Sequence, residues 1–292
     1  MKHLITIAFI YSCFFSFGQT SMFWNNYSNF NPAMSGFQYT QHAAITVRET
    51  WDWNRGIESI QANYNQRIKG SHGIGINYAG SYSIFASNAL KLNYNYQFNF
   101  NKAGKLSVGT GMGFGNSRIR EKYIPAFDPF GTISPQNYLL LNFGTAYSWK
   151  NLIAGVSMSN ITIVTSNTTA TSTGPRIGWN AHLGYGFQLS RAFQLTPRMI
   201  YATTNGFHRL GSNLTATYKS KFALGVSYNF NSQFGVNVGW DIKEKFRVAY
   251  NYGLTLSQLT NTLYSGRHEF SIGYIIKDKS AKGFVNIGTP AF

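Results

Sequence analysis

Histidines are the residues of this sequence most suited to acid–base or metal chemistry. Beyond the first twenty residues they are His42, His72, His182, His208 and His268. None has the spacing of a zinc-binding helix, and no cluster of cysteine and histidine occurs. His268 and Glu269 are adjacent, so in a strand they point to opposite faces. His208 and Asp128 fall in expected outer loops and could meet as a hydrolase would require, but we expect no enzyme activity, no metal and no cofactor.

A row of glycines raises the possibility of phosphate binding. The stretch "GTGMGFG", residues 109–115, has a spacing similar to that of some phosphate-binding loops. It lacks the strand-to-helix context and the Lys-Ser/Thr pair that such loops need. We interpret the row as a crowded lumen wall or a sharply curved strand.

Scattered charges share the polar faces of the predicted strands. They are Lys91, Arg198, Lys219, Arg247 and Glu269. If those faces line a lumen, such charges can tune ion selectivity or anchor a plug. They can also be ordinary solvated wall residues.

The elements that position these side chains are strands. In "NALKLNYNYQFNFN", residues 88–101, apolar residues occupy the even positions and polar ones the odd positions, which is the period of a strand with two different faces. In a soluble sandwich the apolar face would meet a core, whereas in a membrane barrel it would meet lipid.

Composition decides between these two architectures. Aromatic residues make up 17% of the chain and charged residues only 12%, about half the usual charged share of soluble domains. A large sandwich would need many more surface charges for solubility. Beyond the first twenty residues there is no apolar run long enough for a transmembrane helix. The sequence therefore predicts an all-β fold, a transmembrane antiparallel up-and-down β-barrel of the outer membrane with about fourteen strands.

The strand pattern and the connections support this fold. The candidate strands are 41–50, 57–67, 73–82, 87–100, 105–117, 138–149, 152–159, 176–189, 193–203, 209–219, 221–230, 233–241, 245–254 and 266–276. If the first strand starts in the periplasm, the three longest connections are all extracellular, and most of the short, often basic turns are periplasmic. This asymmetry is typical of bacterial barrels.

We divide the chain into four parts. Residues 1–18 are expected to be a secretory signal peptide, 19–39 a periplasmic N-terminal segment, 40–276 the barrel and 277–292 a periplasmic C-terminal tail. The only cysteine, Cys13, lies in the signal; acylation at Cys13 is the alternative, but the apolar run continues past it. The formal net charge of +16 favours anionic lipid headgroups, since an exported chain does not meet cytoplasmic nucleic acid.

Several motifs together resemble one family. "YSNFNPAMSGF" is similar to the Asn-Pro-Ala-x-x-Gly opening of the PorP/SprF family of the Bacteroidetes type IX secretion system, and "ITVRETWDW", with Arg48, is similar to the Arg-x-x-Trp signature that follows. "HGIGINYAGSYS", "KLSVGTGMGFG" and "YSGRHEFSIGYII" resemble its later strands. The resemblance implies an outer-membrane barrel that works in secretion, gliding motility or the surface attachment of large adhesins.

Two functions remain open at this stage. The first is a barrel that binds a secreted or surface adhesin and other type IX secretion components, with outer-membrane lipid around it and no nucleic-acid or small-molecule partner. Its candidate partner or lumen residues are Asn31, Pro32, Gly36, Arg48, Lys91, Arg198, Arg247 and Glu269; the first three are expected to shape the periplasmic opening. The alternative is a general diffusion porin. A barrel of purely mechanical role also remains open.

Overall fold

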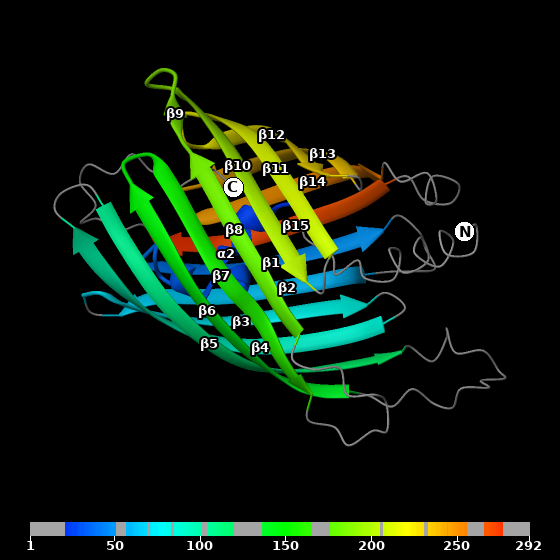
Figure 1. Cartoon of the computed structure of the whole chain (residues 1–292). Helices are drawn as coiled ribbons and strands as arrows, with labels where there is room; N and C mark the ends of the chain where they lie inside the picture. Colours follow the sequence, from blue (N-terminus) through cyan, green and yellow to red (C-terminus); the bar gives the residue numbers. More distant parts are fainter. Residues whose placement is uncertain are drawn as a thin grey trace, which may run out of the picture.

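The structure, a computed structural model, is a single β-barrel (Figure 1). It describes residues 21–50, 57–68, 70–82, 85–100, 104–119, 136–164, 176–204, 207–230, 233–243, 245–255 and 266–276. The expected signal peptide and C-terminal tail lie outside the described residues. No helix in the described part is both long and apolar enough to cross a membrane.

The wall is built from antiparallel strands that follow one another in sequence. The first eight are β1 (Gln41–Thr50), β2 (Ile57–Ile68), β3 (His72–Tyr82), β4 (Phe85–Phe100), β5 (Gly104–Ile119), β6 (Gln136–Trp149), β7 (Leu152–Val164) and β8 (Arg176–Tyr185). The remainder are β9 (Phe187–Gln188), β10 (Phe193–Thr204), β11 (Phe207–Tyr218), β12 (Phe222–Asn229), β13 (Gln233–Ile242), β14 (Phe246–Thr255) and β15 (Gly266–Ile276).

The sheet closes on itself. Apart from β8 and β9, strands that are neighbours in sequence pair with each other, and β1 pairs with β15 over ten residue pairs, from Gln41 opposite Ile276 to Thr50 opposite Arg267. The short β9 continues β8, because both pair with β10. Counted as one strand, they make a closed barrel of fourteen strands, which confirms the predicted fold.

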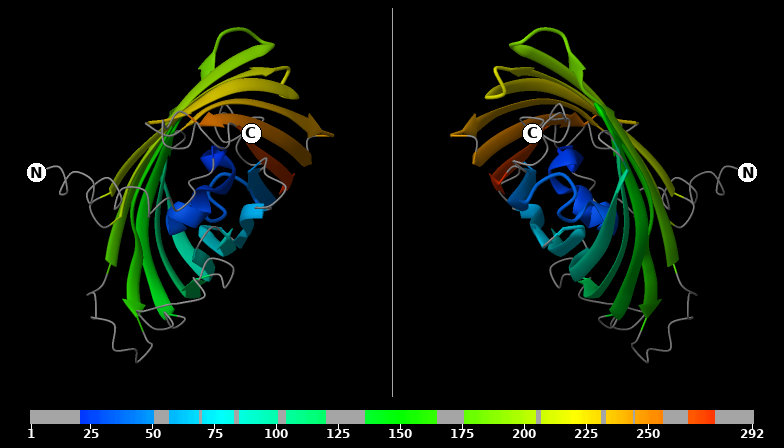
Figure 2. Two further views of the ribbon diagram at one scale, coloured as in Figure 1. Left: turned by 90° about the vertical axis from the view of Figure 1, so that its right-hand side faces the viewer. Right: turned by 90° about the vertical axis from the view of Figure 1, so that its left-hand side faces the viewer.

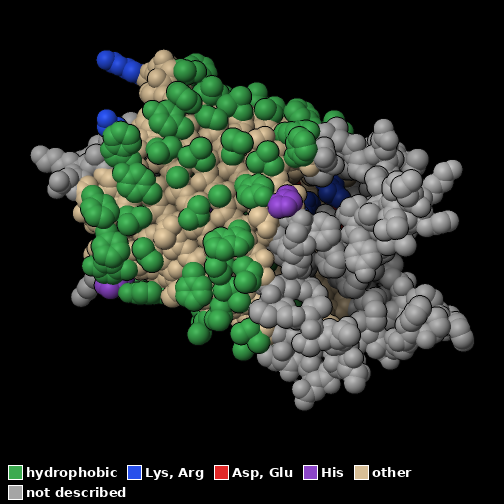
Figure 3. Space-filling view, viewed as in Figure 1, with side chains coloured by type: hydrophobic (Ala, Val, Ile, Leu, Met, Phe, Trp, Pro, Cys, Tyr) green, Lys and Arg blue, Asp and Glu red, His purple; other side chains and the backbone are tan. Residues whose placement is uncertain are grey.

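The two faces of the wall differ as the alternation predicted. On β4, Leu92 is 51% exposed on the outer face, whereas its neighbours Lys91 and Asn93 are each 5% exposed inside. Figure 3 shows hydrophobic side chains spread over the outer surface. Apolar side chains that would be costly in water are stable there because they face lipid. The protein is therefore an outer-membrane barrel with a polar lumen.

The N-terminal segment lies inside this barrel, as both views in Figure 2 show. It forms three short helices, η1 (Phe23–Asn26), α2 (Tyr27–Phe30) and η2 (Pro32–Met34). We expected residues 19–39 to lie in the periplasm, and the described part, residues 21–39, lies in the lumen instead. The physical reason is that this segment carries large apolar side chains, which are stabilised by burial against the wall.

The segment crosses the lumen lengthwise. The backbone amide of Ser21 contacts Glu269 near the long-connection end of β15, while the amide of Thr40 donates to the carbonyl of Ile276 at the opposite end (2.9 Å). Long connections are usually extracellular and short turns periplasmic in such barrels. The segment therefore runs from the outer end of the lumen to the periplasmic end, where β1 begins.

Candidate functional site: the occupied lumen

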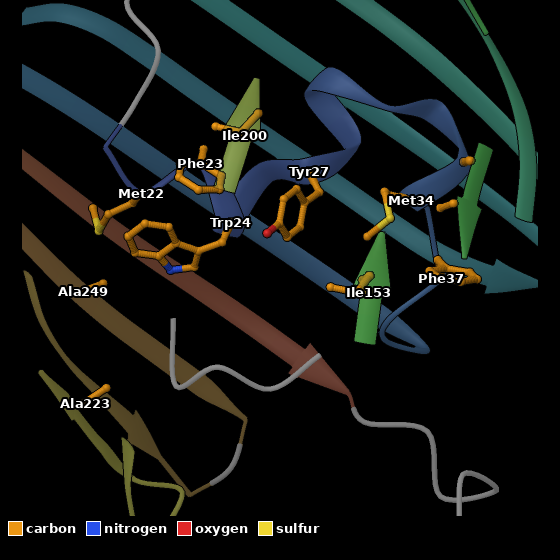
Figure 4. Packing of buried hydrophobic residues seen from close by; sticks show 12 residues of the cluster. Met22, Phe23, Trp24, Tyr27, Met34, Phe37, Ile153, Ile200, Ala223 and Ala249 are labelled. Carbon is orange, nitrogen blue, oxygen red and sulfur yellow. The ribbon is translucent and has the colours of Figure 1, made fainter. Parts of the chain in front are cut away.

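The lumen segment, residues 21–39, is held partly by apolar packing (Figure 4). Met22, Phe23 and Trp24 are at most 3% exposed, and Tyr27 is 4% exposed. They belong to one cluster with wall residues from distant strands, which are Ala146, Ile153, Ile200, Ala223 and Ala249. These small or branched side chains replace the polar residues found elsewhere on the inner face, so part of the wall is shaped for an apolar occupant.

The inner face of β4 binds the backbone of the segment along its length. Lys91 Nζ donates to the carbonyl of Asn29 (2.5 Å) and Asn93 Nδ2 to that of Ser28 (2.9 Å). Further along the same strand, Asn95 Nδ2 donates to the carbonyls of Pro32 and Ser35, and Gln97 Nε2 donates to that of Gly36 (3.1 Å). We call Lys91, Asn93, Asn95 and Gln97 the β4 row. Each of these hydrogen bonds to the segment is accepted by a main-chain carbonyl.

Two further strands bind main-chain carbonyls in the same way. Arg67 on β2 donates through Nε to the carbonyl of Gly36 (3.0 Å) and through Nη2 to that of Phe37 (2.8 Å). Ser157 Oγ on β7 donates to the carbonyl of Phe30 (2.8 Å). These bonds depend on the path of the segment rather than on its side chains.

The Asn31-Pro32 turn fits against glycines of the wall. The Asn31 side chain accepts from the amide of Ala33 (3.0 Å) and donates to the carbonyl of Thr145 (2.9 Å). A Cβ atom at Gly109 would lie 2.6 Å from the backbone nitrogen of Ala33. Such a distance is too short for any side chain, so this member of the glycine row makes room for the segment, and the crowded-wall interpretation is confirmed.

Gly36 occupies a second position that requires glycine. Its φ angle is +64°, and a Cβ atom there would lie 2.7 Å from the carbonyl oxygen of Gln66. Both the left-handed backbone and the contact exclude larger residues. The turn directs the segment along the periplasmic end of β2.

Glu269 holds the other end of the segment. Its carboxylate accepts hydrogen bonds from the backbone amides of Ser21 (2.9 Å) and Met22 (3.1 Å), and the side chain is 1% exposed. Arg48 lies opposite Glu269 in the pairing of β1 with β15, and its Nε is 3.7 Å from Glu58. A buried carboxylate with two amide donors and a facing guanidinium is electrostatically compensated.

The segment also bonds to both sides of the β1–β15 closure. Asn25 Nδ2 donates to Ser271 Oγ on β15 and Asn26 Nδ2 to Thr46 Oγ1 on β1, each at 3.3 Å. Thr46 Oγ1 in turn donates to Ser271 Oγ (3.0 Å). This small network connects the segment to the first and last strands at once.

The buried charges of the lumen are predominantly cationic. Arg247 forms a two-bond pair with Asp241 (2.7 and 2.8 Å) and donates to Tyr39 Oη (3.4 Å). Arg198 lies over the ring of Trp24, 5.5 Å from its centroid, and donates to Asn213 and Thr215. Residues 21–39 contain no charged side chain. Lys91 and Arg198 are therefore compensated by dipoles and an aromatic ring rather than by a carboxylate of the segment.

A small cavity lies between the segment and the wall. Its volume is about 20 Å³, and it is lined by Trp24, Tyr27 and the β2 residues Asn63 and Asn65, so it is large enough for one water molecule. The segment is thus bound through a mixture of apolar and polar contacts.

The structure places the candidate residues from the sequence as follows. Arg48, Lys91, Arg198, Arg247 and Glu269 are all buried inside the barrel. Lys219 is not inside; it is exposed in the turn after β11. Asn31 and Pro32, expected at the periplasmic opening, lie within the lumen against β5, β6 and β7, and only Gly36 lies near the periplasmic end. Arg67 was not among the candidate residues, although its place on the polar face of the predicted strand 57–67 is a usable signal.

The histidines do not converge. His182 faces the lumen, its ring 4.7 Å from that of Tyr27, whereas His208 bonds to Tyr201 (2.6 Å) and His268 to Tyr250 (2.8 Å). Asp128 lies outside the described residues. Within the described part of the chain, no group of three His, Cys, Asp or Glu residues is placed to hold a metal ion.

Solved structures with a similar fold are outer-membrane barrels. The CymD monoaromatic hydrocarbon channel matches with a TM-score of 0.51 and 12% identity, covering 90% of this chain and 94% of that one. The outer membrane protein Omp33 of Acinetobacter baumannii matches with a TM-score of 0.50 and 8% identity, covering 83% and 100%. At these identities the likeness shows the fold alone.

Sequence comparison is more specific. No curated protein matches the chain, but residues 16–274 match the family described as type IX secretion system membrane protein PorP/SprF. This match spans most of the chain, includes every described strand at least in part, and agrees with the barrel just described. The chain therefore belongs to the PorP/SprF family and is an outer-membrane component of the type IX secretion system.

Proposed function

We propose that this barrel supports the secretion or cell-surface attachment of a large secreted protein, such as an adhesin, by holding a polypeptide segment of that protein in its lumen. The observation that carries the proposal is the binding mode of residues 21–39. Within the type IX secretion family, a lumen that already binds a peptide segment is suited to binding another. Other secretion components are the expected partners at its rims.

The contacts of the β4 row explain how such an exchange would work. Lys91, Asn93 and Gln97 donate to main-chain carbonyls of the lumen segment. Every polypeptide offers such carbonyls, so recognition through them gives affinity without a strict sequence requirement. A partner segment of similar path would satisfy the same donors, and the side-chain pockets around the apolar cluster would add selectivity.

The charge of the lumen suggests the chemistry of the partner segment. Lys91 and Arg198 are each at most 5% exposed, and the lumen segment offers them no carboxylate. A partner segment carrying an acidic residue would gain charge-assisted hydrogen bonds there. We therefore expect the bound segment to combine aromatic or aliphatic residues with at least one carboxylate.

A secretion assay in cells tests the proposed function. Deleting the gene should abolish surface display of one large adhesin while other type IX cargo still leaves the cell. Complementation with the wild-type gene should restore display, and the double variant Lys91→Met with Arg198→Met should restore it incompletely at equal barrel abundance. Normal adhesin display in the deletion strain would overturn the proposal.

The porin alternative predicts a different measurement. An open diffusion pore would give steady conductance in a planar bilayer, whereas residues 21–39 lie in the lumen and pack against its wall. We expect the purified full-length protein to be closed for most of the recording, and removal of residues 21–37 to produce steady conductance. Steady conductance of the full-length protein would favour the porin.

A further inference from the structure

Lysines occupy an unusual backbone conformation at one end of the barrel. Lys150, Lys219 and Lys243 have φ angles of 48°, 49° and 50°, in the left-handed region that glycine and asparagine adopt most easily. Each lies in a tight turn at the periplasmic end, after β6, β11 and β13 respectively. Ser220, next to Lys219, shares this conformation with a φ of 53°, so the left-handed backbone belongs to the tight turns themselves. In three of these turns it is adopted by a lysine.

These lysines belong to a larger basic collar. The exposed basic residues at the periplasmic turns are Lys150, Arg191, Lys219, Lys221, Lys243 and Lys245. Among the described residues of these turns and their strand ends, the carboxylate present is that of Asp241, which is 5% exposed and paired with Arg247 inside the barrel. The described part of this rim is therefore strongly cationic.

Two of the lysines lie against lipid-facing aromatic rings. Lys150 Nζ is 4.8 Å from the ring centroid of Trp149, and Lys219 Nζ is 5.2 Å from that of Tyr218. Trp149 is 45% and Tyr218 38% exposed on the outer face. Aromatic side chains at strand ends lie at the level of lipid headgroups. The two ammonium groups are thus at headgroup height rather than extended into the periplasm.

We propose that this basic collar binds the phosphate groups of anionic phospholipids in the periplasmic leaflet of the outer membrane. Lysine is a suitable phosphate ligand because it has three donors on a flexible stem. The rings of Trp149 and Tyr218 face the acyl chains, so the pairs Lys150–Trp149 and Lys219–Tyr218 are each suited to contact both parts of a lipid. An acidic protein is less suitable as the ligand, since Lys150 and Lys219 fold back toward the lipid face.

The test uses a variant that removes the charge while relieving the backbone strain. Lys150→Asn, Lys219→Asn and Lys243→Asn are combined, because asparagine tolerates the left-handed conformation. The full-length protein is placed in nanodiscs of phosphatidylcholine with or without phosphatidylglycerol, and the lipids retained are counted by native mass spectrometry. Lys105→Asn at a strand end serves as the single-charge control.

The wild-type protein should retain phosphatidylglycerol in preference to phosphatidylcholine. In the triple variant the ratio of retained phosphatidylglycerol to phosphatidylcholine should fall roughly fivefold for each lysine removed. The variant should also unfold at the same or a higher temperature in phosphatidylcholine alone, which distinguishes lost lipid binding from a damaged barrel. An unchanged preference in the triple variant would overturn the proposal, including the case in which an acidic protein is the real ligand of the collar.

Discussion

Glu269 provides the sharpest test of how the lumen segment is held. Its carboxylate accepts the backbone amides of Ser21 and Met22 at 2.9 and 3.1 Å. In Glu269→Gln the side chain keeps its shape but loses its charge, and its amide group is turned toward one of the two donors. The perturbation therefore acts on the outer end of the segment while leaving the β4 row intact.

The expected effect follows from the two bonds. A hydrogen bond to a charged group contributes about 1.5–3 kcal/mol to stability. Glutamine retains one acceptor oxygen, so we expect docking of the segment to weaken by about 2–3 kcal/mol. This corresponds to a roughly 30- to 150-fold larger population of the undocked segment.

The undocked population can be measured with a cysteine at position 22. Met22 is 0% exposed, and the only natural cysteine, Cys13, lies in the expected signal peptide. In Met22→Cys, reaction with a water-soluble thiol reagent requires the segment to leave its site. If redocking is fast compared with labelling, the labelling rate follows the undocked population, and Glu269→Gln should accelerate it by the factor above.

Glu58→Gln is the matched control. Glu58 lies 3.7 Å from Arg48 and 3.6 Å from Arg267, so the substitution removes a neighbouring carboxylate that has no bond to the segment. We expect it to change labelling by less than about fivefold. Unchanged labelling in Glu269→Gln, in a barrel that still shows heat-modifiable migration in gels, would refute the anchoring role of Glu269.

Two further predictions concern the lumen and the wall. Gly109→Val should displace the Asn31-Pro32 turn and increase labelling of the same reporter, whereas Gly273→Ala, whose nearest Cβ contact would be 3.3 Å, should not. Leu92→Lys should destabilise the barrel to urea in vesicles by about 2–4 kcal/mol, and Phe100→Lys near the interface by about 0–1 kcal/mol.

Alternation made the barrel predictable from sequence. The predicted strands 41–50 and 266–276 coincide with β1 and β15. The prediction works because side chains along a barrel strand point alternately to lipid, where they are apolar, and to the lumen, where they are polar. Lys91 and Arg247 were predictable as inward residues for the same reason. The residue types on one face of a strand therefore indicate whether that face meets lipid or water.

The position of the lumen segment was not predictable in this way. "SMFWNNYSNFNPAMSGFQ" has no strand or helix period, and a short polar-aromatic segment can lie in the periplasm or fill a pore without any change in its pattern. Its location depends on contacts such as Asn31 with Thr145, which are 114 residues apart. Lys219 was misplaced because a shift of one residue at a strand end moves a side chain from the wall to the turn.

The bonds of the segment to both β1 and β15 have a consequence for the order of assembly. The contact between Ser21 and Glu269 joins residues 248 positions apart, and its full set of partners exists only after the last strand has met the first. Residues that are synthesised early thus reach their final place late, since such distant contacts form slowly. Docking of the segment is therefore complete only when the barrel is closed. In an unfinished barrel the apolar residues Met22, Phe23 and Trp24 would be exposed to quality-control proteases.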